Sequence, residues 1–267
     1  MIKWVVCDLD NTLLTGDKRL SPKTLEVLAS LRDKGIAVGL ATGRAYELAK
    51  PYAQAIQTDL PLILNNGALT KTLKGAVLSA SHLKPEVFRP LITYANEHGY
   101  PVTFHAEEGF YTEDPERLAF YDAWNQRHKD AAVSVHALNR LHDTQRVYKM
   151  LMVIDDPSRM TATLEQFRHH PNCHITRSQH NFLDVLPPDT SKGEALLVLL
   201  KGANIKPEEI IVFGDEDNDV EMLQLSPHSY AMPNASNNAK EAACHLAFDD
   251  HDADGVAKTL ASWLKRL

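Results

Sequence analysis

Short apolar runs alternate with helix-forming segments along the first part of the chain. The apolar runs are residues 4–9, 36–42 and 60–67, and the helix-forming segments between them are residues 21–35 and 43–56. None of these runs shows a clean polar–apolar alternation, which is typical of parallel strands covered by helices on both faces. This feature constrains the architecture most, because strand and helix in alternation predict a doubly wound, Rossmann-like α/β fold with a parallel sheet.

The same alternation returns from about residue 190. A helix is expected at residues 191–205 and a strand at residues 210–215. Between residues 83 and 186 the signals change to longer polar helices and to strands that alternate or carry aromatic residues, which predicts an inserted α+β domain. We therefore expect one core domain made of residues 1–82 and 187–267, interrupted by a second domain at residues 83–186.

The composition is that of a soluble globular protein. Apolar residues make up 44% of the chain and charged residues 24%, values that leave little room for a disordered or fibrous class. The formal net charge of −7 comes without a Lys/Arg block, so nucleic acid is not an expected partner. No segment approaches the length of a membrane span, and the few cysteines lack metal-ligand spacing, which favours reduced thiols and a cytoplasmic location. Monomer and homodimer both stay open.

Polar side chains end each predicted strand of the core. Ligands of open α/β sheets bind beyond the carboxyl ends of the strands, so these residues mark the expected site. A lysine also stands at the expected start of the helix at residues 191–205, where the helix dipole disfavours a cation unless an anion lies nearby. The candidate residues are Asp8, Asp10, Thr42, Arg44, Asn66, Lys192, Asp215, Asn218 and Asp219.

Asp8 and Asp10 lie two residues apart at the end of the first strand, where their side chains can converge if the chain turns. Repulsion would then raise one pKa sharply unless a cation lay between the two carboxylates. Together with Asp215 and Asp219 they form a set of oxygen ligands without His or Cys, which suits Mg²⁺ better than zinc. Hydroxyl, ammonium and backbone N–H donors among the neighbouring residues suit a phosphate group. The pattern therefore predicts a phosphoryl-transfer site.

Four segments of the core resemble, in order and spacing, the four motifs of the haloacid dehalogenase (HAD) superfamily. They are "DLDNTLL", "ATGR", "SKGEAL" and "GDEDNDVEML". The later segments "AMPNASNNAKEAA" and "DGVAKTL" resemble the end of the Cof-type branch of that superfamily. Residues 83–186 fall where this branch carries a large cap domain of the C2B type. The resemblance implies a phosphatase core with bound Mg²⁺ and a cap that selects the substrate.

The resemblance also implies a role for each candidate residue. Asp8 would attack the phosphorus atom and form an aspartyl-phosphate, and Asp10 would protonate the leaving oxygen and then activate the hydrolytic water. Pro233 departs from the family pattern, which usually has glycine there, and leaves the role of Asn234 open. The other implied roles are Mg²⁺ binding by Asp8, the Asp10 backbone carbonyl and Asp215, supported by Asp219, phosphate binding by Thr42, Lys192 and Asn218, and positions near the substrate for Arg44 and Asn66.

The expected activity is hydrolysis of a small phosphorylated metabolite, either a sugar phosphate or a cofactor phosphate. A large cap can close over such a compact substrate and exclude bulk water. The alternatives are a phosphosugar mutase that uses the same aspartyl-phosphate and a non-catalytic phosphometabolite sensor, whereas Asp10 argues against a carbon–halogen hydrolase. Polar residues that interrupt the apolar strands of the insertion are further candidates for substrate contacts, namely His105, Glu107, Glu113, Asn181 and Asp184.

Overall fold

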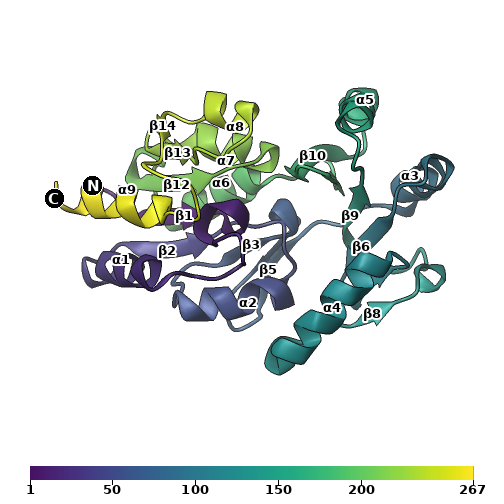
Figure 1. Ribbon diagram of the computed structural model, residues 1–267, viewed down its shortest axis with the longest axis horizontal. Coiled ribbons are helices and arrows are strands. Elements are labelled where there is room, and N and C mark those ends of the chain that lie inside the picture. Colours follow the sequence, from purple (N-terminus) through teal and green to yellow (C-terminus); the bar gives the residue numbers. More distant parts are fainter. Residues whose placement is uncertain (267) are drawn as a thin grey trace.

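The computed structural model describes residues 1–266 as two neighbouring parts, a core with a parallel sheet and an inserted α+β part (Figure 1). The strand order of the core sheet is β14-β13-β12-β1-β2, and every pair in it is parallel. Its strands are β1 (Trp4–Cys7), β2 (Ala37–Leu40), β12 (Ile210–Gly214), β13 (Ser229–Ala231) and β14 (His245–Leu246).

The register of the core sheet brings the ends of its central strands to one level. Cys7 at the end of β1 lies opposite Phe213 of β12 on one side and Leu40 of β2 on the other. The residues that follow these three strands therefore meet at the same edge of the sheet, as expected for the ligand-binding edge of a parallel fold.

Helices cover both faces of the core sheet. Successive residues of a strand point to opposite faces, and Val5 and Val6 are both buried. The helix α1 packs against α9, and α6 packs against α7. The predicted doubly wound α/β core is confirmed. The core helices are α1 (Pro22–Asp33), α2 (Tyr46–Ala55), α6 (Lys192–Ala203), α7 (Val220–Leu225), α8 (Asn237–Ala242) and α9 (Gly255–Leu264), and residue 267, the last of the predicted core domain, lies outside the described residues.

A small antiparallel sheet that the sequence analysis did not predict follows the core strand β3 (Leu62–Leu64). A bridge between Ala41 and Ile63 joins β3 to the parallel sheet. The chain then forms a hairpin from β4 (Leu69–Lys71) and β5 (Val77–Ala80), and both strand pairs, β3–β4 and β4–β5, are antiparallel. The hairpin carries the chain from the edge of the core to the inserted part.

The inserted part has a sheet of its own, with strand order β10-β11-β9-β6-β7-β8. All six strands lie between residues 83 and 186, so we keep this range as the proposed extent of the cap domain. The core of the inserted part includes Phe88, Phe104 and Met150, which are fully buried. Its elements are α3 (Pro85–His98), β6 (Val102–Ala106), β7 (Gly109–Thr112), α4 (Pro115–Arg127), β8 (Val135–His136), β9 (Val147–Val153), α5 (Pro157–Phe167), β10 (His174–Gln179) and β11 (Phe182–Leu186).

The two parts meet through a small apolar cluster between α2 of the core and α4 of the insertion. Ala45 and Leu48 from the core pack with Phe110, Tyr121 and Trp124 of the insertion. The contact holds α4 over the ligand-binding edge of the core sheet. Side chains from α4 are thereby placed near the polar residues that end the core strands.

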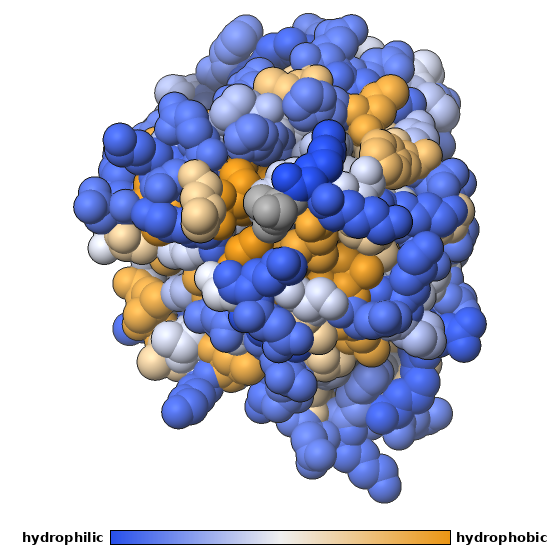
Figure 2. Space-filling model, turned by 90° about the vertical axis from the view of Figure 1, so that its left-hand side faces the viewer, coloured by the Kyte–Doolittle hydropathy of each residue, from blue (hydrophilic) through white to orange (hydrophobic). Residues whose placement is uncertain are grey.

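The face that carries both chain termini is mostly hydrophilic, with apolar side chains in small groups between the polar ones (Figure 2). Among the large apolar residues that stay exposed in the molecule are Leu246 and Phe248, both more than half exposed. Within residues 1–266, no helix is long and apolar enough to cross a membrane.

Candidate active site

Asp8 lies directly after β1 and faces the buried amine of Lys192. The Asp8 backbone N–H donates to the Phe213 carbonyl at 3.0 Å, which holds Asp8 in register with the end of β12. Lys192 Nζ donates to Asp8 Oδ1 at 2.6 Å and to Asp219 Oδ1 at 2.7 Å. Lys192 is the first residue of α6, whose preceding residue Ser191 accepts a hydrogen bond from the backbone of the first turn. The lysine is therefore fixed between two carboxylates.

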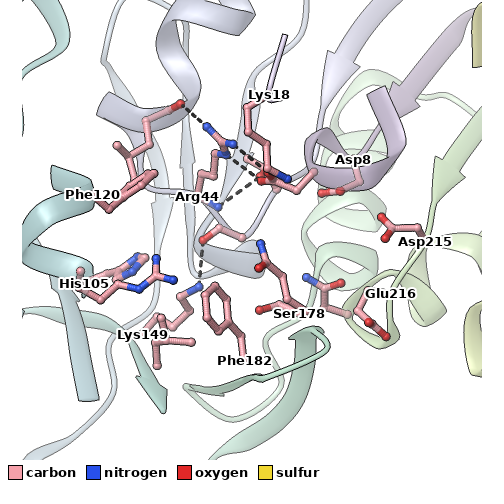
Figure 3. Close-up of a pocket in the computed structure, with 18 of the residues that line it drawn as sticks. Asp8, Lys18, Arg44, His105, Phe120, Lys149, Ser178, Phe182, Asp215 and Glu216 are labelled. Atoms are coloured by element: carbon pink, nitrogen blue, oxygen red, sulfur yellow. Dashed lines mark hydrogen bonds and ion pairs between the residues drawn. The ribbon is translucent and has the colours of Figure 1, made fainter. Parts of the chain in front are cut away.

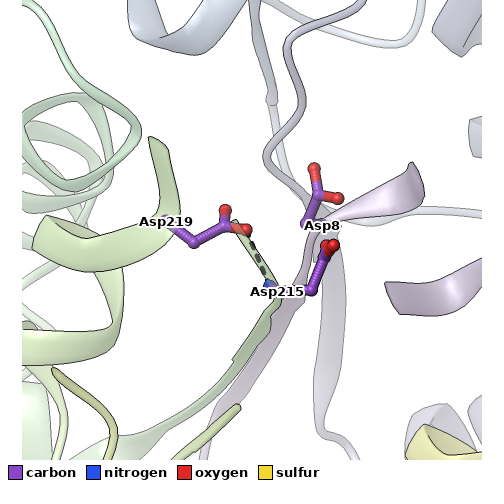
Figure 4. A group of neighbouring side chains, drawn as sticks. All are labelled: Asp8, Asp215 and Asp219. Atoms are coloured by element: carbon purple, nitrogen blue, oxygen red, sulfur yellow. Dashed lines mark hydrogen bonds between the residues drawn. The ribbon is translucent and has the colours of Figure 1, made fainter. Parts of the chain in front are cut away.

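Three buried carboxylates form a cluster at this edge of the sheet (Figure 4). One oxygen from each of Asp8, Asp215 and Asp219 lies within 4.8 Å of the other two. Asp219 Oδ2 accepts from the backbone N–H groups of Asp215 and Glu216, at 2.9 and 3.2 Å. Gly214 permits this approach, because a Cβ atom there would lie 2.6 Å from Asp219.

Asp8 and Asp215 each have one carboxylate oxygen that accepts no hydrogen bond from the described residues. Thr12 Oγ1 donates to Asp215 Oδ1 at 2.7 Å, which leaves Asp215 Oδ2 without a hydrogen-bond partner among the described residues. Asp8 Oδ2 is likewise unpartnered within residues 1–266, whereas Asp219 uses both oxygens on protein donors. Two free carboxylate oxygens supported by a third acid form a donor set that Mg²⁺ prefers. The residues present therefore fit Mg²⁺, and the free oxygens of Asp8 and Asp215 are available to it.

The proton affinities of the cluster reflect its burial. Burial raises the pKa of Asp8 to about 7; Lys192 opposes this shift, and the neighbouring carboxylates add to it. Burial and then the charge of Asp8 raise the pKa of Asp215 well above its ordinary range. Burial alone would lower the pKa of Lys192, but Asp219 and Asp8 outweigh it and hold the pKa above its ordinary value. Lys192 is therefore an ammonium ion, and the acids gain from a second cation.

The side chain of Asp10 turns away from this cluster. Its carboxylate accepts two hydrogen bonds from Arg44, at 2.7 and 2.8 Å, and forms an ion pair with Lys18 at 3.0 Å. Burial alone would raise the pKa of Asp10, but Arg44 and then Lys18 outweigh it and hold the pKa well below its ordinary range. Asp10 is therefore ionised in this arrangement, and Arg44, expected near the substrate, contacts Asp10 directly.

Of the predicted phosphate-binding residues, Lys192 contacts Asp8, and Asn218 belongs to a separate polar network. Thr42 is buried and lines the cavity. Asn218 Nδ2 donates to Asn66 Oδ1 at 2.9 Å, and Asn66 Nδ2 donates to Asp184 Oδ2 at 2.7 Å. Lys149 Nζ donates to the same Asp184 oxygen and to the Gly43 carbonyl, both at 3.0 Å. Asn66 therefore links Asn218 to the inserted part.

A cavity of about 210 Å³ lies between the strand ends and the inserted part (Figure 3). Thr42, Asp8 and Asp215 line it from the core, and Arg44 and Lys18 lie at one side. The sequence analysis missed most of the residues that line it from the insertion. The spacing of Arg117, Phe120 and Tyr121 shows that they share one face of α4, but it does not show that this face lines the cavity. The lining residues from the insertion are His105, Arg117, Phe120, Tyr121, Lys149, Leu151, Ser178, Gln179 and Phe182.

The other residues singled out in the sequence lie in different places. His105 lines the cavity, and its Nδ1 lies 2.8 Å from Asn65 Oδ1. Glu107 forms an ion pair with Arg146, and Asn181 donates to Asp155, so neither faces this cavity. Glu113 is exposed and also lies outside its lining, and Asn234 donates to the Asn11 carbonyl at 2.9 Å.

Comparison with known proteins identifies the family. A sequence profile described as "haloacid dehalogenase-like hydrolase" matches residues 5–260. The chain belongs to this family of hydrolases. It is 27% identical to the pyridoxal phosphate phosphatase YbhA of Escherichia coli, over 97% of this chain and 98% of that protein. It is 29% identical to the HMP-PP phosphatase of Serratia proteamaculans, over 99% of this chain and 96% of that protein.

The fold of this haloacid dehalogenase-like hydrolase is also found among solved structures. The crystal structure of SMU.1108c from Streptococcus mutans superposes with a TM-score of 0.84, at 22% identity, and covers 99% of this chain and 100% of that one. The resemblance inferred from the four sequence motifs is therefore confirmed at the level of family and fold.

Proposed function

We propose that this protein is a Mg²⁺-dependent phosphatase that hydrolyses a small phosphorylated metabolite, a sugar phosphate or a cofactor phosphate, through an aspartyl-phosphate. One observation carries the proposal: Asp8 has one oxygen fixed by Lys192 at 2.6 Å and the other free beside Asp215, at the floor of the cavity. A buried, oriented carboxylate with a free oxygen is suited to nucleophilic attack. The substrates in the names of two relatives, the pyridoxal phosphate phosphatase YbhA and the HMP-PP phosphatase, support a compact phosphorylated substrate.

The first half of the reaction transfers the phosphoryl group to the protein. One carboxylate oxygen of Asp8 attacks phosphorus, a bond forms between them, and the bond from phosphorus to the leaving oxygen breaks. Lys192, which contacts Asp8, and Thr42 and Asn218, which line the cavity, would donate hydrogen bonds to the phosphoryl oxygens. Bound Mg²⁺ would neutralise phosphoryl and carboxylate charge at Asp8 and Asp215.

The second half releases phosphate. Asp10 would give a proton to the leaving oxygen in the first half and take one from water in the second, and that water attacks phosphorus and restores Asp8. The ion pair with Arg44 keeps Asp10 in the form that accepts a proton. To donate a proton to the leaving oxygen, Asp10 would first have to take one up, while Arg44 keeps its carboxyl group oriented.

The test is inorganic phosphate release from a panel of sugar phosphates and cofactor phosphates, with Mg²⁺ and with EDTA. Release by the wild type is expected to need Mg²⁺, and Asp8→Asn is expected to lower it by at least about a thousandfold. Asp17→Asn is the matched control, because Asp17 is an exposed aspartate of the same segment. Retained turnover in Asp8→Asn would refute the nucleophile.

Two further outcomes separate the alternatives. Phosphoryl exchange between sugar bisphosphates and monophosphates, with little net phosphate release, would favour the mutase. Binding of phosphometabolites without any transfer would favour the sensor. A cytoplasmic location stays a prediction, based on the small number of cysteines, and the choice between monomer and homodimer is likewise untested.

A further inference from the structure

Arg117 differs from the other cations that line the cavity. Lys18 and Arg44 each have Asp10 as an ionic partner, at 3.0 and 2.7 Å. Lys149 has Asp184, at 3.0 Å. Arg117 lines the same cavity, but its side chain forms no ion pair or hydrogen bond with any residue in the range 1–266. Its positive charge is thus the one in the described lining that the protein leaves uncompensated.

The guanidinium of Arg117 is held in place by aromatic rings. Its central carbon lies 4.3 Å from the ring centroid of Phe182 and 5.7 Å from that of Phe120, and both rings line the cavity (Figure 3). A guanidinium stacked on a ring keeps the N–H donors at its edge free. Arg117 is therefore positioned by packing, while its donors are available to a ligand.

The surroundings of Arg117 favour an anion. Arg117 is the third residue of α4 (Pro115–Arg127), and the two acids at this helix start, Asp114 and Glu116, do not pair with its guanidinium. Lys149 and His105 share the same wall of the cavity. Burial, with the charges of Lys149 and Arg117, keeps the pKa of His105 well below its ordinary value, so His105 is neutral. This wall therefore carries net positive charge opposite the carboxylates of the core.

We propose that Arg117 is a specificity-determining residue that binds a second anionic group, a carboxylate or a second phosphate, on the leaving-group part of the substrate. Phe120 and Phe182 form the apolar sides of this subsite. The inference rests on the proposed phosphatase function, because it places the phosphoryl group at Asp8 and the second anion at the other wall of one cavity. The cavity volume of about 210 Å³ limits the substrate to a compact molecule.

Matched pairs of phosphate esters test this subsite. Glycerol 3-phosphate and 3-phosphoglycerate differ by a carboxylate, and fructose 6-phosphate and fructose 1,6-bisphosphate differ by a second phosphate. The wild type is expected to show the higher kcat/KM for the more anionic member of at least one pair, and the pair that responds identifies the anion. Arg117→Gln should lower that value about tenfold or more, as for loss of a charged hydrogen bond, and leave the other member nearly unchanged.

A control and two contrary outcomes complete the test. Arg127→Gln is the control. Arg127 lies on the same helix, is exposed and does not line the cavity, so its substitution should change kcat/KM for neither member of a pair. Equal losses for both members of each pair in Arg117→Gln, or no preference in the wild type, would overturn the proposal. Phosphate release from p-nitrophenyl phosphate tests the phosphatase separately.

Binding measurements keep the subsite testable if no ester is hydrolysed. Titration calorimetry measures the affinity of the wild type and of Arg117→Gln for both members of each pair in the presence of Mg²⁺. The difference in affinity within a pair shows whether the second anion is bound. Tighter binding of the more anionic member that is lost in Arg117→Gln would support the subsite even though the proposed hydrolysis had failed. Equal binding of both members would overturn it.

Discussion

The guanidinium of Arg44 holds the carboxylate of Asp10 at two points, with Nε at 2.7 Å from Oδ2 and Nη2 at 2.8 Å from Oδ1. Both side chains are largely buried. Arg44 is itself fixed, because its guanidinium carbon lies 5.0 Å from the ring centroid of Tyr52. A paired, planar contact of this kind sets the orientation of Asp10 as well as its charge.

Arg44→Lys is expected to impair catalysis although it keeps the positive charge. Lysine cannot form the two parallel hydrogen bonds, so Asp10 loses its orientation. We expect kcat/KM for an alkyl phosphate to fall about a hundredfold. The fall for p-nitrophenyl phosphate should be smaller, because that leaving group needs little help from an acid. Exposed Arg19→Lys is the control. Equal losses for both esters would mean that Arg44 acts on the substrate and not through Asp10.

The effect of Mg²⁺ on stability should grow with pH. The folded pKa of Asp8 is raised to about 7 from an ordinary value of about 3.9, so the folded state holds an extra proton between these values. Without metal, the contribution of Asp8 to the free energy of unfolding is therefore present at low pH and is lost as the pH rises to about 7. Asp215, whose pKa is also raised, acts in the same direction. Since Mg²⁺ binds the ionised carboxylates, its stabilising effect increases over this range.

Thermal unfolding with saturating Mg²⁺ and with EDTA, at about pH 5 and about pH 8, measures this dependence. The rise in Tm on adding Mg²⁺ should be small at the lower pH and larger at the higher one. Asp215→Asn should remove most of the rise, whereas exposed Asp17→Asn should keep it. A rise of equal size at both pH values would contradict the assignment of the metal to these acids.

The sequence predicted the core of the site better than its surroundings. Asp8 and Asp215 could be placed together from local pattern alone, because each directly follows an apolar strand and parallel strands end at one edge. The partner of Asp10 could not be predicted in this way, since Arg44 reaches it only through the fold of the loop after β2. Arg117 and Phe120 were missed because a polar helix does not reveal which face packs against a second part of the molecule.

The ion pair between Asp184 and Lys149 should stabilise the fold and support catalysis. Both side chains are almost fully buried, and Asp184 also accepts from Asn66. Asp184→Asn leaves the Lys149 ammonium buried without an anion, which should cost about 3 kcal/mol of unfolding free energy. It should also lower kcat, because Asn66 positions Asn218. Urea unfolding and phosphate release check the two effects.

A double-mutant cycle isolates this pair. Asp184→Asn combined with Lys149→Met should cost less than the sum of the two single changes, because neither charge is then left alone. Asp155→Asn, at an exposed position of the inserted part, should be nearly neutral. Strictly additive losses would show that the two side chains act independently.

Gly67 should tolerate no side chain, because it lies against the start of the helix that carries Lys192. Its φ is +97°, and a Cβ atom there would lie 2.2 Å from the carbonyl oxygen of Ser191. We expect Gly67→Ala to cost more than about 3 kcal/mol of unfolding free energy, the sum of a left-handed backbone and a backbone clash. Gly99→Ala is the matched control, with φ +69° and no atom within 4 Å, and should cost only about 1 kcal/mol. Denaturant unfolding compares the two, and phosphate release from folded Gly67→Ala should fall as the start of α6 shifts Lys192 away from Asp8. Equal costs at the two glycines would show that the contact with Ser191 yields easily and does not fix the position of Lys192.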